Sequence, residues 1–205
     1  MGGTEQTPPM QLVLLDGQTE LHLDRLQGLW TDEQYLQLSL QTNRLMEVTD
    51  GFIEFLPPVT CKHQGISAWI LLYLFPLIQR RGGALYFGPL CVRIRPGKYR
   101  KPDLLLLLDR NDPRNQHDFW DGADLVVEIA GAYNPERDTR VKRVDYAEGG
   151  IPEYWIVNPI TESITVLRLE GAQYVEHGVF RRGDQATSAL LPEVLIPVDA
   201  AFDAK

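Results

Sequence analysis

The sequence predicts an α/β fold in which helices flank a mixed central β-sheet. Two continuously apolar runs, at residues 103–108 and 124–130, are typical of central strands that are covered on both faces. The apolar residues of a predicted helix at 62–81 cover most of its circumference, as expected for a helix buried against a sheet. Predicted helices and strands also alternate along the chain, which favours helices packed in layers on a sheet.

The first elements follow from local signals. Thr31-Asp32-Glu33 predicts the start of a helix that runs to about Gln41, with Thr31 as its N-cap. Two alternating runs on either side of Asp50-Gly51, a favoured tight-turn pair, predict a β-hairpin that Pro57-Pro58 ends.

The middle and the end of the chain continue the alternation. The apolar helix at 62–81 should end at Gly82-Gly83, and Pro76 could kink it. The elements expected after it are strands near 85–95, 103–108 and 124–130, a helix from about Pro135 to Glu148, and the strands EYWIVN and ITVLRL.

Length and composition fit one domain over residues 11–205, preceded by a disordered leader at 1–10. The longest apolar run, Ile66 to Ile78, has 13 residues, whereas a membrane span needs about 20. No signal sequence opens the chain, so no membrane partner and a cytoplasmic location are expected. Cys61 and Cys91 lack metal-binding spacing and are interpreted as reduced thiols in the core.

Charge is distributed unevenly. The net charge is −8, yet residues 61–150 hold 14 Lys/Arg against 11 Asp/Glu. Basic residues in this block could contact a phosphate backbone, or they could form an ordinary solvated surface of mixed charge. The residues proposed as DNA contacts are Arg93, Arg95, Lys98, Arg100, Lys101, Arg140 and Arg143.

Two acidic residues enter strands that should be buried. Asp103 lies at the start of one apolar strand and Glu128 lies inside another, on the same face as Val126 and Ala130. A lone carboxylate in an apolar setting is costly, but two neighbouring carboxylates could share a Mg²⁺ or Mn²⁺ ion. The alternative interpretation is a cap and a buried salt bridge. If the metal-free acids only repel each other, replacing either should leave thermal stability equal or higher.

A lysine on the following helix could complete such a site. Asp138, Lys142 and Tyr146 are spaced i, i+4, i+8 and therefore share one helical face. Lys142 could point at the two acids and orient or activate a water molecule. The alternative is a surface ion pair between Asp138 and Lys142. Glu47 and Glu54, which flank the hairpin turn, could each supply a further acid.

These motifs resemble a known family. The stretches Pro102-Asp103, DLVVEIA and ERDTRVKRVDYAEGGIPEYWIVNP are similar to those of the Uma family of restriction endonucleases, within the PD-(D/E)xK nuclease superfamily. The resemblance covers about residues 30–202 and rests on Glu128, Asp138, Lys142, Tyr146, Gly150, Glu153, Tyr154 and Trp155.

The resemblance implies a restriction-endonuclease-like fold and a set of roles. Asp103, Glu128 and the carbonyl of Ile129 would bind Mg²⁺ or Mn²⁺, and Lys142 would act as the superfamily's catalytic lysine. His63 falls where the family opens its first core helix with a histidine; with Asp138 and Tyr146 it is a supporting residue. The chain departs from the parent motif at Ala130, where that motif has its lysine, at residues 131–134, and at Asn158.

The expected function is therefore Mg²⁺-dependent hydrolysis of DNA phosphodiester bonds by an endonuclease. DNA is the expected partner, and a homodimer is left open. The alternative is a catalytically silent protein of the same fold that binds nucleic acid or a protein partner.

Overall fold

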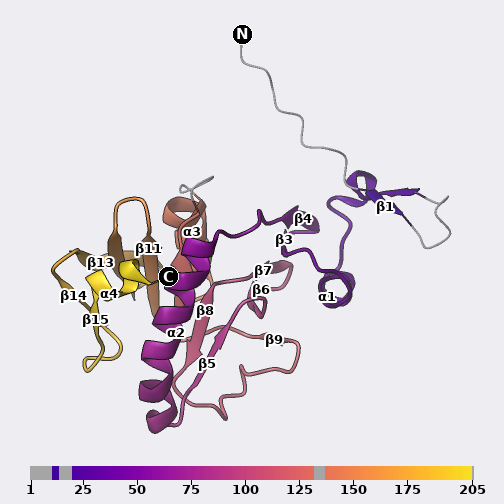
Figure 1. Ribbon diagram of the computed structural model, residues 1–205. Helices are drawn as coiled ribbons and strands as arrows, with labels where there is room; N and C mark the ends of the chain where they lie inside the picture. The colour runs from indigo at the N-terminus through magenta and orange to yellow at the C-terminus, as the bar shows by residue number, and fades with distance from the viewer. Residues whose placement is uncertain (1–10, 14–19, 132–136, 205) are drawn as a thin grey trace.

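A six-stranded mixed sheet forms the centre of the molecule (Figure 1). The computed structural model describes residues 11–13, 20–131 and 137–204, so the expected leader at 1–10 lies outside the described residues. Strands β10 and β11 are parallel, and the other neighbouring pairs of this sheet are antiparallel. The strands in spatial order are β13 (Gln173–Arg181), β12 (Ser163–Glu170), β11 (Glu153–Asn158), β10 (Leu125–Ile129), β8 (Leu104–Leu107) and β5 (Ala84–Phe87).

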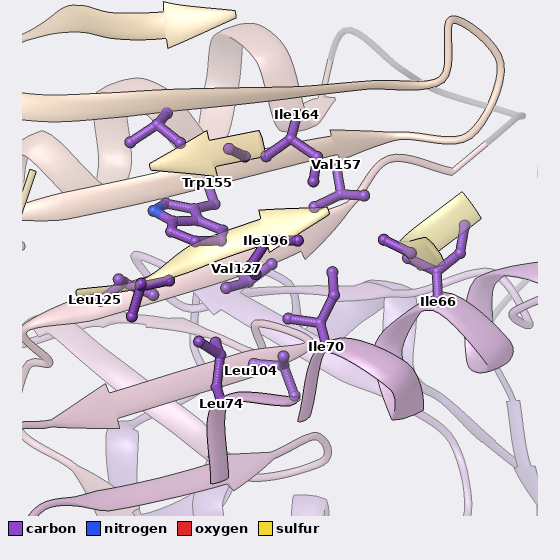
Figure 2. Packing of buried hydrophobic residues seen from close by; sticks show 14 of the residues in the cluster. Ile66, Ile70, Leu74, Leu104, Leu125, Val127, Trp155, Val157, Ile164 and Ile196 are labelled. Carbon is purple, nitrogen blue, oxygen red and sulfur yellow. The ribbon is translucent and has the colours of Figure 1, made fainter. Parts of the chain in front are cut away.

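One long helix covers one face of this sheet. Helix α2 (Cys61–Arg81) begins at its N-cap Thr60 and ends at Gly82, whose positive φ only glycine adopts without strain. Its residues Ile66, Ile70, Leu74 and Ile78 repeat every four positions and pack on Leu104, Leu106, Leu125 and Val127 of the sheet. Figure 2 shows part of this contact.

The burial of α2 differs from the prediction. Leu72 and Phe75, on its outer face, are exposed, so the helix is buried on one face and not around its whole circumference. Cys61, at its first position, is also exposed, whereas Cys91 is buried as expected. An apolar residue count around a helix cannot tell which side meets the sheet, and this explains the exposure of Leu72 and Phe75.

The hairpin predicted around Asp50-Gly51 belongs to a second, five-stranded sheet. Its strands in spatial order are β4 (Phe52–Phe55), β3 (Met46–Thr49), β7 (Lys98–Arg100), β6 (Cys91–Arg95) and β9 (Phe119–Trp120). The region expected as strand near 85–95 is thus divided between two sheets, with a cis Gly88-Pro89 bond between its parts. This second sheet, like β13 and the elements after it, was not predicted.

Smaller elements complete the structure. Helix α1 (Asp32–Gln41) has Thr31 as its N-cap with a full capping box, which confirms the sequence prediction, and it packs Tyr35 on the second sheet. The remaining elements are β1 (Gln11–Val13), β2 (Glu20–His22), the 3₁₀ turn η1 (Leu23–Leu26), β14 (Gln185–Thr187), β15 (Leu195–Pro197) and α4 (Val198–Asp203).

The helix expected from 135 to 148 has two parts. A π-helical turn η2 (Arg137–Val141) leads directly into α3 (Lys142–Glu148), and residues 135–136 lie outside the described part. Tyr146 of α3 packs with Tyr154, Ile151 and Ile94 on the face of the central sheet opposite α2. Within the described residues, no helix combines the length and the apolar character needed to cross a membrane.

Candidate active site

The two acids predicted from the sequence lie at one end of two neighbouring strands. Strands β8 and β10 are antiparallel, and their last paired residues are Leu104 and Val127. Asp103 directly precedes Leu104 and Glu128 directly follows Val127, so the two acids lie at the same end of this strand pair. The backbone N–H of Ile129 donates a hydrogen bond to Oδ2 of Asp103 at an N···O distance of 2.7 Å. This bond holds the Asp103 carboxylate at this end of the sheet.

Glu128 is buried, with 3% of its surface exposed, and its charge is compensated. The Nζ of Lys142 lies 2.6 Å from Glu128 Oε1, and the hydroxyl of Tyr146 donates to the same oxygen. Lys142 and Tyr146 are one helical turn apart on α3, so the shared face inferred from their spacing does meet the acid. Burial, followed by the negative charge of Glu128, raises the pKa of Tyr146 well above its ordinary value, so Tyr146 stays a hydrogen-bond donor.

This ion pair changes the expectation about thermal stability. Replacing Glu128 alone would leave the buried ammonium of Lys142 without its nearest partner, which is destabilising. The expected neutral or favourable effect therefore holds only for Asp103, the more exposed of the two acids.

His63 contacts the other acid from the opposite side. It lies in the first turn of α2, and its Nε2 is 3.2 Å from Asp103 Oδ2. Its second ring nitrogen, Nδ1, is buried and has no hydrogen-bond partner among the described residues. The site is thus bounded by the start of α2 on one side of the sheet and by α3 on the other.

A third acid, Glu47 of β3, lies directly behind Lys142. Its Oε1 accepts a hydrogen bond from the backbone N–H of Lys101 at 2.9 Å and lies 3.8 Å from Lys142 Nζ. Its Oε2 accepts from Arg137 at 2.5 Å and is 3.7 Å from Arg100 Nε. Burial alone would raise the pKa of Glu47, but the positive charges of Lys142, Arg100 and Arg137 outweigh it and hold that pKa below its ordinary value.

Glu47 and Glu54 were both considered from the sequence, and the structure separates them. Glu54 is exposed and, among the described residues, contacts only Arg137, which bridges it to Glu47. Arg137 is one of the 14 Lys/Arg in residues 61–150. Its contact with two acids on the hairpin has no local sequence signal, because the partners lie 83 and 90 residues away.

Both acids line one cleft with a volume of about 360 Å³. Asp103, Glu128, Ile129, Lys142 and His63 all line it. Among the described residues, no group of three or more His, Cys, Asp or Glu side chains is arranged to hold a metal ion. A site here would therefore combine two carboxylates with a backbone carbonyl. Hard oxygen donors of this kind suit Mg²⁺ or Mn²⁺, and Oδ1 of Asp103 takes part in no hydrogen bond with the described residues.

Most of the predicted DNA contacts do not lie on an open basic surface. Lys98, Arg100 and Lys101 are buried: the first two bind Asp145, and Lys101 donates to Ser39. Burial also lowers the pKa of Lys101. These three cationic groups are therefore held by partners within the protein, although Lys101 also lines the cleft.

The other predicted contacts are closer to solvent but are also engaged. Arg93 binds Asp121, and Arg95 binds both Asp50 and Glu148. Arg143 donates to the carbonyl of Tyr174, and Arg140 is exposed. The side chain of Asp138, a predicted supporting residue, lies outside the described part.

Comparisons with known proteins agree with the fold. The Uma2 family model, described as "Putative restriction endonuclease", matches residues 32–199, and the chain therefore belongs to this family. This confirms the resemblance inferred from the motifs.

A solved structure is also similar. It is described as "a putative nuclease belonging to DUF820 from Anabaena variabilis", with a TM-score of 0.67 and 17% sequence identity over 82% of this chain and 97% of that one. At this identity the likeness shows the fold, which is restriction-endonuclease-like. No curated protein matches the chain.

Proposed function

We propose that the protein is a divalent-metal-dependent endonuclease that hydrolyses DNA phosphodiester bonds. One observation carries the proposal: Asp103 and Glu128 lie at the same end of two central strands, in one cleft, with Lys142 bound to Glu128. Membership of a family described as restriction endonucleases supports it.

Asp103, Glu128 and the carbonyl of Ile129 would hold the metal. A bound Mg²⁺ or Mn²⁺ ion polarises a phosphoryl oxygen and makes a bound water more acidic. The N–H of Ile129 and the ring of His63 orient the Asp103 carboxylate. The hydroxyl of Tyr146 does the same for Glu128.

Lys142 supplies positive charge inside the cleft. Its ammonium lies between Glu128, at 2.6 Å, and Glu47, at 3.8 Å. These two contacts hold the ammonium in a fixed position. A fixed ammonium at this point can orient an attacking water and stabilise negative charge on the phosphate. The pKa of Glu47 is held below its ordinary value, so its carboxylate provides a second negative charge beside this ammonium.

The test is cleavage of supercoiled, linear and branched DNA by the purified protein in Mg²⁺ and in Mn²⁺. We expect cleavage by the wild type and a loss of at least about 100-fold in Asp103→Asn and Glu128→Gln. Asp109→Asn is the matched control, because Asp109 is an exposed acid beyond the other end of β8 and should leave cleavage unchanged.

Two results would count against the proposal. Asp103→Asn that cuts as fast as the wild type would overturn the site assignment. A wild type that binds DNA but cuts none of the three substrates with either metal would favour the catalytically silent binding protein.

A further inference from the structure

The cleft beside the acids is largely apolar. Besides the acids and bases, it is lined by Leu45, Leu56, the segment 57–59, Pro89, Pro159 and Ile160. Val59 and Ile160 are large hydrophobic side chains that remain exposed there, and 65% of the surface of Ile160 is open to solvent. Exposed apolar side chains that gather in a concave site are typical of a place where a ligand covers them.

The charge of the cleft does not suit a continuous duplex. Four cationic side chains line it, against the acids Glu54, Asp103 and Glu128, and each cation has a partner within the protein. Lys62 donates to the carbonyl of Phe202, and the other three are Lys101, Arg137 and Lys142, bound to Ser39, Glu47 and Glu128 respectively. Duplex binding depends on several Lys or Arg side chains that neutralise phosphates, and this lining is nearly balanced in charge.

Two residues that line the cleft each carry a buried polar atom without a partner in the described part of the chain. His63 Nδ1 and Arg137 Nε are buried and make no hydrogen bond with the described residues. Buried polar atoms are nearly always satisfied in folded proteins, so each such case calls for an explanation. A ligand that brings both an apolar face and hydrogen-bonding edges, and toward which these two side chains turn, would supply it.

We propose that the cleft binds one unpaired nucleotide, with its base against the apolar lining and its edges near His63 and Arg137. The substrate would then be DNA with an unpaired nucleotide at the scissile bond. This inference rests on the proposed function and deepens it. The base pairs of an intact duplex stay stacked inside the helix, whereas an unpaired base can enter a pocket and be contacted on its face and edges. Glu128 and Lys142 are also buried, which favours a single unpaired nucleotide over a whole duplex as the group that approaches them.

The test is binding by the full-length Asp103→Asn protein in metal-free buffer, which separates binding from cleavage. Fluorescence anisotropy would compare one fluorescent DNA strand alone with the same strand in a blunt duplex, at one salt concentration because affinity depends on salt. We expect the single strand to bind at least about tenfold more tightly than the duplex. Adding Ile160→Asp should weaken single-strand binding about tenfold, because it places a charge against the base.

Leu72→Asp is the matched control. Leu72 is as exposed as Ile160 but lies on the outer face of α2, away from the cleft, so this change should leave single-strand binding unaltered. Equal or tighter binding of the duplex would overturn the inference. So would an Ile160→Asp variant that binds the single strand as well as its parent does.

Cleavage of the same two substrates by the wild type separates this inference from the proposed function. Cleavage of the duplex as fast as the single strand would support the proposed endonuclease activity but overturn the inferred site for an unpaired nucleotide. Cleavage of neither substrate, with the single strand still bound tenfold more tightly, would overturn the endonuclease activity but support the nucleotide site.

Discussion

Replacement of Lys142 by methionine should destabilise the protein strongly, because it removes the charge but keeps most of the side-chain volume. Lys142 is 4% exposed, and the two acids beside it, Glu128 and Glu47, are 3% and 1% exposed. Removing one partner of a buried ion pair leaves an uncompensated charge and typically costs about 3–5 kcal/mol. For a chain of this size, that corresponds to a melting temperature lower by about 6–20 °C.

A double-mutant cycle tests whether the cost comes from the pair. In Lys142→Met with Glu128→Gln, no charge is left unpaired at Glu128, and Tyr146 can still donate to the amide oxygen. We expect the double variant to be more stable than Lys142→Met, with a coupling energy of at least about 2 kcal/mol. Urea unfolding, monitored by circular dichroism, measures each free energy of unfolding. The comparison requires that the slope of this free energy against urea concentration is the same for all variants.

Lys62→Met is the matched control for this experiment. Lys62 is exposed and donates only to the carbonyl of Phe202 among the described contacts, so the change should cost about 1 kcal/mol or less. A Lys142→Met variant within about 1 kcal/mol of the wild type, or a coupling energy near zero, would refute the buried pair.

Two further changes test the surroundings of the site. The pKa of Glu47 lies below its ordinary 4.5, so its contribution to stability is complete above about pH 4.5 and is lost as the pH falls through the lowered value. Glu47→Gln should therefore be less stable than the wild type at neutral pH, by a margin that narrows in acid; a margin that stays constant down to pH 3 in urea titrations would contradict this. Cys91 is buried and its pKa is raised to about 11 by that burial, whereas Cys61 is exposed. An aromatic disulfide reagent at about pH 8 should modify one thiol quickly and the second only in denaturant, and Cys91→Ala should remove the reaction that needs denaturant; fast reaction of both thiols without denaturant would argue against this burial.

Local signals in the sequence predicted several elements well. The capping box at Thr31 and the Asp50-Gly51 turn are set by residues within a few positions of each other, and the structure forms both. That Asp103 and Glu128 line one cleft could also be anticipated, because each acid begins or enters one of two apolar strands. That reasoning required only that the two strands be neighbours, and they are.

Long-range ion pairing could not be read from the sequence. Lys98, Arg100 and Lys101 resemble a basic stripe when read in order, but Lys98 and Arg100 pair with Asp145, 47 and 45 residues further along the chain. Lys101 directly follows β7, a three-residue element too short to give a periodic pattern, and it is buried and donates to Ser39, 62 residues earlier. The same limit applies to Glu47, because its partners Arg137 and Lys142 are far from it in the sequence.

The central claim is that Asp103 and Glu128 together hold a divalent metal ion, and anomalous scattering from crystals soaked in Mn²⁺ tests it most directly. The account predicts an anomalous peak in the cleft, at about 2.0–2.6 Å from a carboxylate oxygen of each acid, and no such peak in crystals of Asp103→Asn. Crystals of the wild type with Mn²⁺ bound elsewhere, or with no peak beside either acid at saturating Mn²⁺, would contradict it.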